Sequence, residues 1–188
     1  MKNKQVTQFG VCKMEYKGGA AVSDLSPVLL RDEYYVQYQQ IVDEAFYEMR
    51  KALNIRPFDA HRYTLMNLED LKQNTYIVLD GDNIICGATI KVTENGVGEI
   101  DSLVVNPKYQ RQGFGRKIAF FAVSHLQSCG VCPITLSVTS WNRAAVRLYQ
   151  SMGFEIIAEA MAEGVNTQDA DGNWRFEFVG ETQQIMRR

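Results

Sequence analysis

The segment from Gly98 to Thr139 has the pattern of a strand, a glycine-containing turn, a helix and a second strand. GEIDSLVV and ITLSVT have strand patterns, and RKIAFFAVSHLQS between them places apolar residues at helical spacing. Two strands joined by a helix pair in parallel through a right-handed crossover. The chain is therefore predicted to contain a parallel strand pair that flanks one helix.

The preceding sequence predicts more helix and an antiparallel sheet. Residues 32–54 repeat apolar side chains every three or four positions, as in an amphipathic helix, and residues 65–71 predict a second, shorter helix. TYIVLDGDNIICGATIKV predicts two strands around Asp80–Asn83, and Asn95-Gly96 turns the chain into the strand GEIDSLVV. These three strands are expected to be consecutive and antiparallel.

The following sequence adds a helix and a hairpin. Asn142 to Met152 has helical spacing, and Gly153 lies where a C-terminal cap is expected. FEIIAEAMA and WRFEFVGETQQIM predict two strands around Asp171-Gly172. We predict one α/β (α+β) domain over residues 1–188, with a central mixed, mostly antiparallel sheet of about six or seven strands flanked by helices.

Composition favours a soluble protein without disulfides. The start MKNKQVTQFG has no apolar run, and no stretch approaches the roughly 20 apolar residues of a membrane span, so a cytoplasmic protein with no membrane partner is expected. Cys129 and Cys132 form a C-x-x-C pair, but they follow a helix instead of opening one, and His61 and His125 are isolated. No metal is predicted, and His125 is interpreted as a packed core residue.

The charge is distributed unevenly along the chain. Residues 102–154 contain no Asp or Glu but six basic residues, so the rest of a chain of net charge −2 carries −8. The six are Lys108, Arg111, Arg116, Lys117, Arg143 and Arg147. A basic segment in an acidic protein indicates a site for a polyanion, either a nucleotide cofactor or a nucleic acid. The acidic remainder would repel a long polyanion, so no nucleic-acid partner is predicted.

Gly113 and Gly115 lie in the turn that opens the helix of this basic segment. A helix start offers unpaired N–H groups and a partial positive charge, and glycines let a phosphate approach them closely. No Gly-Lys-Ser/Thr closes a P-loop here, and Ile118 stands where a dinucleotide fingerprint needs its third glycine. The turn is interpreted as a pyrophosphate site of another kind.

Three motifs in this region resemble those of the GNAT superfamily of acetyl-CoA-dependent N-acetyltransferases. Gln110-Arg111-Gln112-Gly113-Phe114-Gly115 matches its signature of Gln or Arg, two residues, Gly, one residue, and Gly or Ala. Leu103-x-Val105-x-Pro107 precedes the signature, and SWNRAAVRLYQSMGF follows it. The three motifs cover about residues 98–154. The resemblance implies a GNAT-like fold and acetyl-CoA as the acyl donor.

The resemblance also implies a role for each matching residue. The strand backbone would pair with the pantetheine arm, the turn amides would hold the pyrophosphate, Asn142 would lie near the pantetheine, and Tyr149 would lie near the thiol. The implied cofactor-binding residues are Leu103, Val104, Val105, Gln110, Arg111, Gln112, Gly113, Phe114, Gly115, Arg116, Asn142 and Tyr149. Asn142 could instead be a helix N-cap, and Tyr149 an ordinary core aromatic residue.

For catalysis, the resemblance implies direct attack of an amine on the thioester in a ternary complex. Tyr149 would be the general acid that protonates the leaving thiolate, and Glu99 or Asp101 the general base. Both carboxylates are expected on the strand face of Leu103 and Val105. The alternative is that they are solvated strand carboxylates, or that a water chain leads to the base.

The acceptor is predicted to be a small-molecule or peptide amine, bound by residues of about 30–70 and 155–188. In relatives this pocket comes from the first helices and the last hairpin, here Tyr34, Tyr35, Phe46, Tyr47, Arg50, Glu155, Glu159 and Trp174. A homodimer is expected by analogy. The acceptor's identity and the acyl-chain preference stay open. A non-catalytic module that binds or senses acyl-CoA on the same fold is the alternative function.

Overall fold

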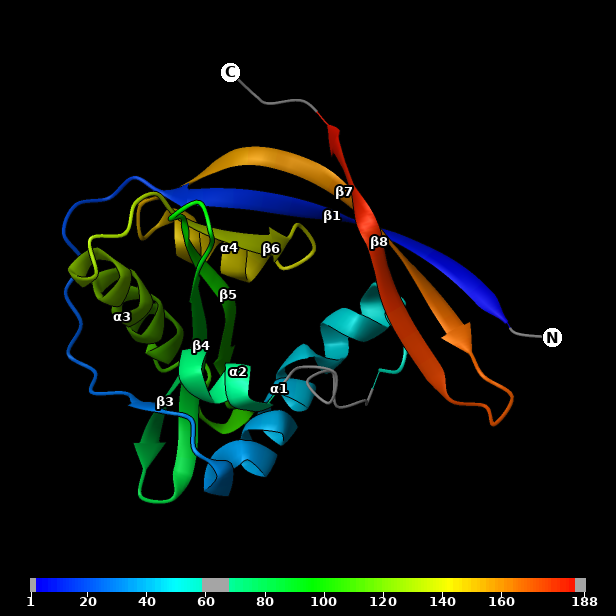
Figure 1. The fold of residues 1–188 in the computed structure, drawn as a ribbon, viewed down its shortest axis with the longest axis horizontal. Coiled ribbons are helices and arrows are strands. Elements are labelled where there is room, and N and C mark those ends of the chain that lie inside the picture. Colours follow the sequence, from blue (N-terminus) through cyan, green and yellow to red (C-terminus); the bar gives the residue numbers. More distant parts are fainter. Residues whose placement is uncertain (1–2, 59–67, 185–188) are drawn as a thin grey trace.

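The computed structural model describes residues 3–58 and 68–184, which form an eight-stranded sheet with helices on both faces (Figure 1). The strands are β1 (Lys4–Tyr16), β2 (Val28–Leu29), β3 (Thr75–Asp80), β4 (Asn83–Val92), β5 (Gly98–Val105), β6 (Ile134–Thr139), β7 (Phe154–Gln168) and β8 (Trp174–Gln184). The helices are α1 (Asp32–Ala52), α2 (Leu68–Asn74), α3 (Phe114–Ser128) and α4 (Arg143–Gln150), with a short 3-10 turn at Pro107–Tyr109.

The sheet has the order β2-β3-β4-β5-β6-β1-β7-β8. Only β5 and β6 pair in parallel among the described strands, and α3 connects them, as predicted. The antiparallel run β3-β4-β5 and the β7–β8 hairpin are also confirmed. The expected count of six or seven strands is too low, because β1 and β2 carried no strand prediction.

β1 lies between β6 and β7 and joins the two halves of the sheet. Its residues Val11 to Glu15 pair with β6, and its whole length from Lys4 to Tyr16 pairs with β7. In Figure 1, β1, β7 and β8 arch over the molecule and extend past the end of α1. We call these three strands the wing.

Two apolar clusters lie on opposite faces of the sheet. Buried residues such as Ile118 of α3 and Tyr149 of α4 pack on one face together with Ile100 of β5. Tyr38 of α1 and Leu71 of α2 pack on the other face. The clusters hold the helices at fixed positions against β4 and β5, with α3 on one side of these strands and α1 on the other (Figure 1).

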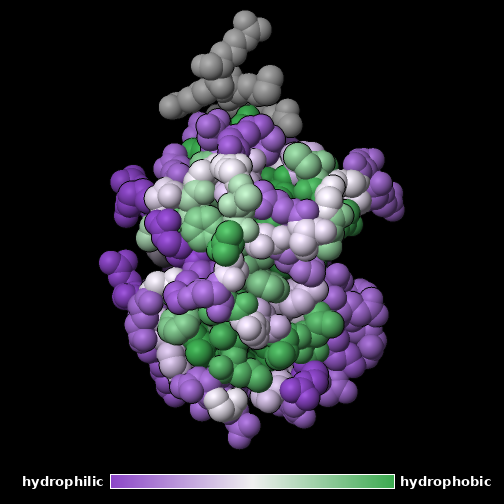
Figure 2. All heavy atoms as spheres, turned by 90° about the vertical axis from the view of Figure 1, so that its left-hand side faces the viewer, coloured by the Kyte–Doolittle hydropathy of each residue, from purple (hydrophilic) through white to green (hydrophobic). Residues whose placement is uncertain are grey.

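The side of the molecule that carries α3 is partly apolar. Figure 2, which faces the left-hand side of Figure 1, shows apolar side chains gathered in its lower half and surrounded by polar ones. Val22, Val28 and Leu29, in and after the segment that follows β1, are exposed.

Candidate functional site

The parallel strands β5 and β6 pair over only three positions. Their ladder runs from Gly98 opposite Ile134 to Ile100 opposite Leu136 and then ends. Beyond that point β6 pairs with β1, while β5 from Ser102 to Val105 pairs with β4 alone among the described strands. The strands therefore diverge, and the β5 main chain presents an edge along which an extended ligand can lie.

A β-bulge at Asp101 marks the point where the strands separate. Ser102 is opposite Thr89 and Ile100 is opposite Ile90, which leaves Asp101 as the extra residue on β5. A bulge shifts the alternation of side chains by one position. Accordingly, Ile100 and Leu103 both contact the cluster beneath α3, although they are three residues apart.

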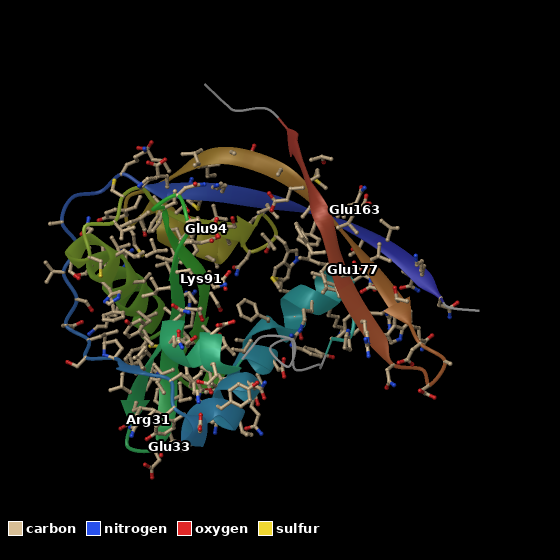
Figure 3. The ribbon with its side chains drawn as sticks, in the orientation of Figure 1. Arg31, Glu33, Lys91, Glu94, Glu163 and Glu177 are labelled. Carbon is tan, nitrogen blue, oxygen red and sulfur yellow. The ribbon has the colours of Figure 1, made fainter. Side chains whose placement is uncertain are left out.

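The bulge overturns the expectation that Glu99 and Asp101 lie on the strand face of Leu103 and Val105. Glu99 precedes Ile100, so its side chain lies on the opposite face of the sheet, the face that carries α1. Its register partner on β4 is Lys91. The Lys91 Nζ lies 3.0 Å from the Asp101 Oδ2, so the bulged carboxylate also reaches that face. Figure 3 shows Lys91 on β4, on the side of the molecule that also holds Glu94. Glu99 and Asp101 therefore lie beside the point where β5 and β6 diverge, on the face of the sheet away from α3.

The glycine turn after β5 presents a row of backbone donors. The Gln110 side chain donates to the Val105 carbonyl (3.2 Å), Arg111 has φ 63°, and Gly113 has φ 88° as the N-cap of α3. In the part of the chain that the structure describes, no backbone N–H from Arg111 to Gly115 donates to another residue. These amides are free to bind an anion at the positive end of the helix.

The charged side chains at this helix start are held by neighbours. The Arg116 backbone N–H donates to the Gly113 carbonyl (3.1 Å), so this amide is engaged inside the turn. Its guanidinium donates to the Ser151 Oγ (2.6 Å), and Lys117 pairs with Asp24 (2.6 Å). Arg111 is exposed and makes no ion pair with a described residue.

Asn142 is the N-cap of α4, and Tyr149 lies on this helix two turns later. The Asn142 Oδ1 accepts from the Ala145 N–H (3.1 Å), which confirms the N-cap interpretation and leaves its Nδ2 as a donor. Tyr149 is only 8% exposed, and its ring packs edge-on against Phe154 with 5.8 Å between centroids. Burial raises the pKa of Tyr149 to about 12, so its hydroxyl is protonated at any physiological pH.

Tyr149 gives the protein an expected loss of stability at high pH. An exposed tyrosine has a pKa of about 10, so the unfolded chain gives up this proton first. Stability from neutral Tyr149 is complete below about pH 10 and falls by on the order of 2 kcal/mol as pH rises through about 12. Urea unfolding near pH 9 and near pH 11 should show a larger loss in the wild type than in Tyr149→Phe. Equal losses would contradict this expectation.

Three other candidate ligands that the structure describes, Cys129, Cys132 and His125, lie in no metal-binding cluster of described residues. Cys129 and Cys132 are exposed free thiols, and residues 3–58 and 68–184 contain no cluster of His, Cys, Asp and Glu that could hold a metal ion. The His125 Nε2 lies 3.2 Å from the Tyr76 hydroxyl and its ring stacks on Phe121, which confirms a packed histidine. His61 and residues 65–67 of the second predicted helix lie outside the described residues. No described helix has the length and apolar character needed to cross a membrane.

Several residues expected near the acceptor have structural partners. Arg50 is buried in α1 and contacts Asp43 (3.2 Å), and the Trp174 ring stacks on the Arg56 guanidinium at 4.9 Å. Glu159 of β7 is opposite Cys12, whose side chain belongs to the cluster beneath α3. Sequence patterns did not single out Lys91, because its position opposite Glu99 depends on the register between β4 and β5.

A model of the acetyltransferase (GNAT) family matches residues 32–154, which include β5, the glycine turn, α3 and α4. The chain belongs to this family. As a GNAT protein it is an acyltransferase by family. The match extends beyond the three motifs to α1, which carried no readable family pattern in the sequence.

Relatives of this GNAT protein include enzymes that differ in length and substrate. The [ribosomal protein bS18]-alanine N-acetyltransferase of Haemophilus ducreyi is 30% identical over 122 residues, which cover 63% of this chain and 82% of the relative. Mycothiol acetyltransferase of Kocuria rhizophila is 39% identical over 59 residues, 31% of this chain but only 20% of that enzyme.

Solved structures confirm the fold. The PaiA N-acetyltransferase of Thermoplasma acidophilum, in complex with coenzyme A, has a TM-score of 0.60 and 13% identity, and the match covers 69% of this chain and 89% of that one.

Proposed function

We propose that this protein binds acetyl-CoA in the opening between β5 and β6 and transfers the acetyl group to a primary amine. The observation that supports this most directly is the continuity of two features. The β5 edge left by β6 leads into the row of free amides from Arg111 to Gly115. One ligand with an extended amide-containing arm and a pyrophosphate fits both.

The pyrophosphate binds at the start of α3. The amides from Arg111 to Gly115 donate to its oxygens, and the positive end of the helix favours its charge. Gly113 presents no Cβ to the ligand, and the exposed Arg111 adds a full positive charge. The amide of Arg116 contributes less than the sequence suggested, because it already donates to Gly113.

The pantetheine arm lies along β5. Main-chain groups of Leu103 and Val105 would pair with its amides as a neighbouring strand does, so the side chains matter little there. The Gln110 side chain already donates to the Val105 carbonyl, so this carbonyl is less available to pair with the pantetheine arm at the end of β5. The Asn142 Nδ2, which donates to no described residue, supplies a donor from the N-cap of α4. This path brings the thioester to the point where β5 meets β6.

In the proposed reaction, Glu99 is the base and Tyr149 is the acid. The amine nitrogen attacks the thioester carbonyl and forms a tetrahedral intermediate, while Glu99 accepts the ammonium proton directly or through water. The intermediate then collapses, the C–S bond breaks, and Tyr149 gives its proton to the departing sulfur. The products are an acetamide and CoA. A raised tyrosine pKa keeps the required proton in place.

Glu99 and Asp101 should be distinguishable as bases. Lys91 holds Asp101 in an ion pair, whereas Glu99 is half-buried beside the opening. We expect Glu99→Gln to lower kcat by about 10- to 100-fold and Asp101→Asn by less than about threefold. Steady-state kcat and KM for the two variants check this. A larger loss in Asp101→Asn would transfer the role of base to Asp101.

Calorimetry with acetyl-CoA, followed by a thiol-release assay, tests the proposed function. The amines should include a peptide with an N-terminal alanine and small-molecule amines, because one relative is named for an alanine of ribosomal protein bS18 and another for the small molecule mycothiol. Micromolar binding with amine-dependent thiol release is the expected result. Binding without turnover on any amine would favour the non-catalytic acyl-CoA module, and absence of binding would refute the proposal.

A further inference from the structure

Residues 17–27, which follow β1, run along α3 on the outside of the molecule (Figure 1). We call this segment the strap. The Gln127 side chain at the end of α3 binds two strap backbone groups, accepting from the Ala21 N–H (2.9 Å) and donating to the Gly19 carbonyl (3.2 Å). Leu25 packs against the cluster beneath α3. The strap is therefore attached to α3 in a defined position.

The far end of the strap brings a carboxylate to the start of α3. The Asp24 Oδ2 lies 2.6 Å from the Lys117 Nζ, and the two side chains are 68% and 44% exposed. Lys117 is in the first turn of the helix, about 6 Å along the axis from Gly113. The hydrogen bond from Lys117 holds the pKa of Asp24 below its usual range, so the carboxylate is charged.

The contact between Asp24 and Lys117 brings a negative charge to a segment whose own sequence has none. Residues 102–154 have no acidic side chain, which suits a site for phosphates. Folding places Asp24 on one of the few basic groups at that site, while Arg116 is bound to the neutral Ser151. A carboxylate and a phosphate near the same ammonium repel each other, and the helix start attracts both.

We propose that Asp24 is a counter-ion that a phosphate of the cofactor displaces from Lys117, so that Asp24 lowers the affinity of the protein for CoA. The inference rests on the proposed function, because it needs CoA at the start of α3. Binding then has two coupled parts: the phosphate gains Lys117, and the strap loses its only ion pair with α3 among the described residues. Gln127 and Leu25 keep the rest of the strap in place.

Calorimetry with CoA compares the wild type with Asp24→Asn and Asp24→Ala at about 20 mM salt. Removing a charge at this distance should lower Kd by roughly three- to tenfold, and about 200 mM salt should reduce the gain. Asp171→Asn, which removes an exposed carboxylate at the β7–β8 turn, is the matched control and should leave Kd unchanged. Adding Lys117→Met to Asp24→Asn should abolish the gain.

Each outcome decides the proposal. Tighter binding of CoA by both Asp24 variants, but not by Asp171→Asn, supports it. A gain that persists with dephospho-CoA assigns the displacing group to the pyrophosphate, and a gain that disappears assigns it to the 3′-phosphate. An unchanged or higher Kd in the Asp24 variants would overturn the inference while leaving the proposed function intact. A wild type that does not bind CoA would refute both.

Discussion

Replacing Gly113 with Asp is expected to weaken acetyl-CoA binding by at least about 100-fold, because the new carboxylate would face the pyrophosphate. Gly113 is the N-cap of α3 with φ 88°, and nothing lies within 4 Å of the position its Cβ would take. In the proposed complex, the new side chain would enter this open space beside the amides from Arg111 to Gly115 and face the pyrophosphate. Titration calorimetry with acetyl-CoA measures the effect.

Two controls separate charge from backbone strain. Gly96 has φ 76° in an exposed turn with equally open surroundings, so Gly96→Asp imposes similar strain without facing the ligand. Gly113→Ala imposes strain without charge. We expect Gly96→Asp to bind normally and Gly113→Ala to lose less than Gly113→Asp. If all three variants bound equally well, the pyrophosphate could not lie at this turn.

Tyr149→Phe is expected to lower kcat on the order of 10³-fold while the Kd for acetyl-CoA changes little. Only the hydroxyl is removed, and the ring can keep its edge-on contact with Phe154. The thiolate would then leave without its proton donor. Thiol release under saturating acetyl-CoA and amine measures kcat, and calorimetry measures Kd.

Tyr16 provides a matched control, because its ring also packs edge-on against Phe154, at 5.1 Å. Its hydroxyl donates to the Gly19 carbonyl in the strap. Tyr16→Phe should therefore keep full kcat. A Tyr149→Phe enzyme with near-normal kcat would show that water or another group protonates the thiolate.

Local features of the site were readable from the sequence. The glycines that open α3, the N-cap Asn142 and the crossover from β5 to β6 depend on residues close together in the chain, so spacing alone predicts them. The packing of His125 and the capping by Asn142 were also expected and are seen in the structure.

Features that depend on distant partners were not readable. The bulge at Asp101 exists only in the register between β5 and β4, and it decides the face on which Glu99 lies. β1 alternates weakly, since buried positions include the polar Thr7, and its burial comes from pairing with β6 and β7. Asp24 and Lys117 are 93 residues apart in the chain. No local pattern reports such contacts.

The position of β1 bears on the order in which the protein can assemble. β1 is synthesised before the other described strands, but its neighbours in the sheet, β6 and β7, are synthesised more than 100 residues later. Contacts of such long sequence separation form slowly. Most of the described chain must therefore be synthesised before β6 can pair with β1. The divergence of β6 from β5 depends on this pairing. Until that stage, β1 is an unpaired strand that a chaperone or another chain could bind.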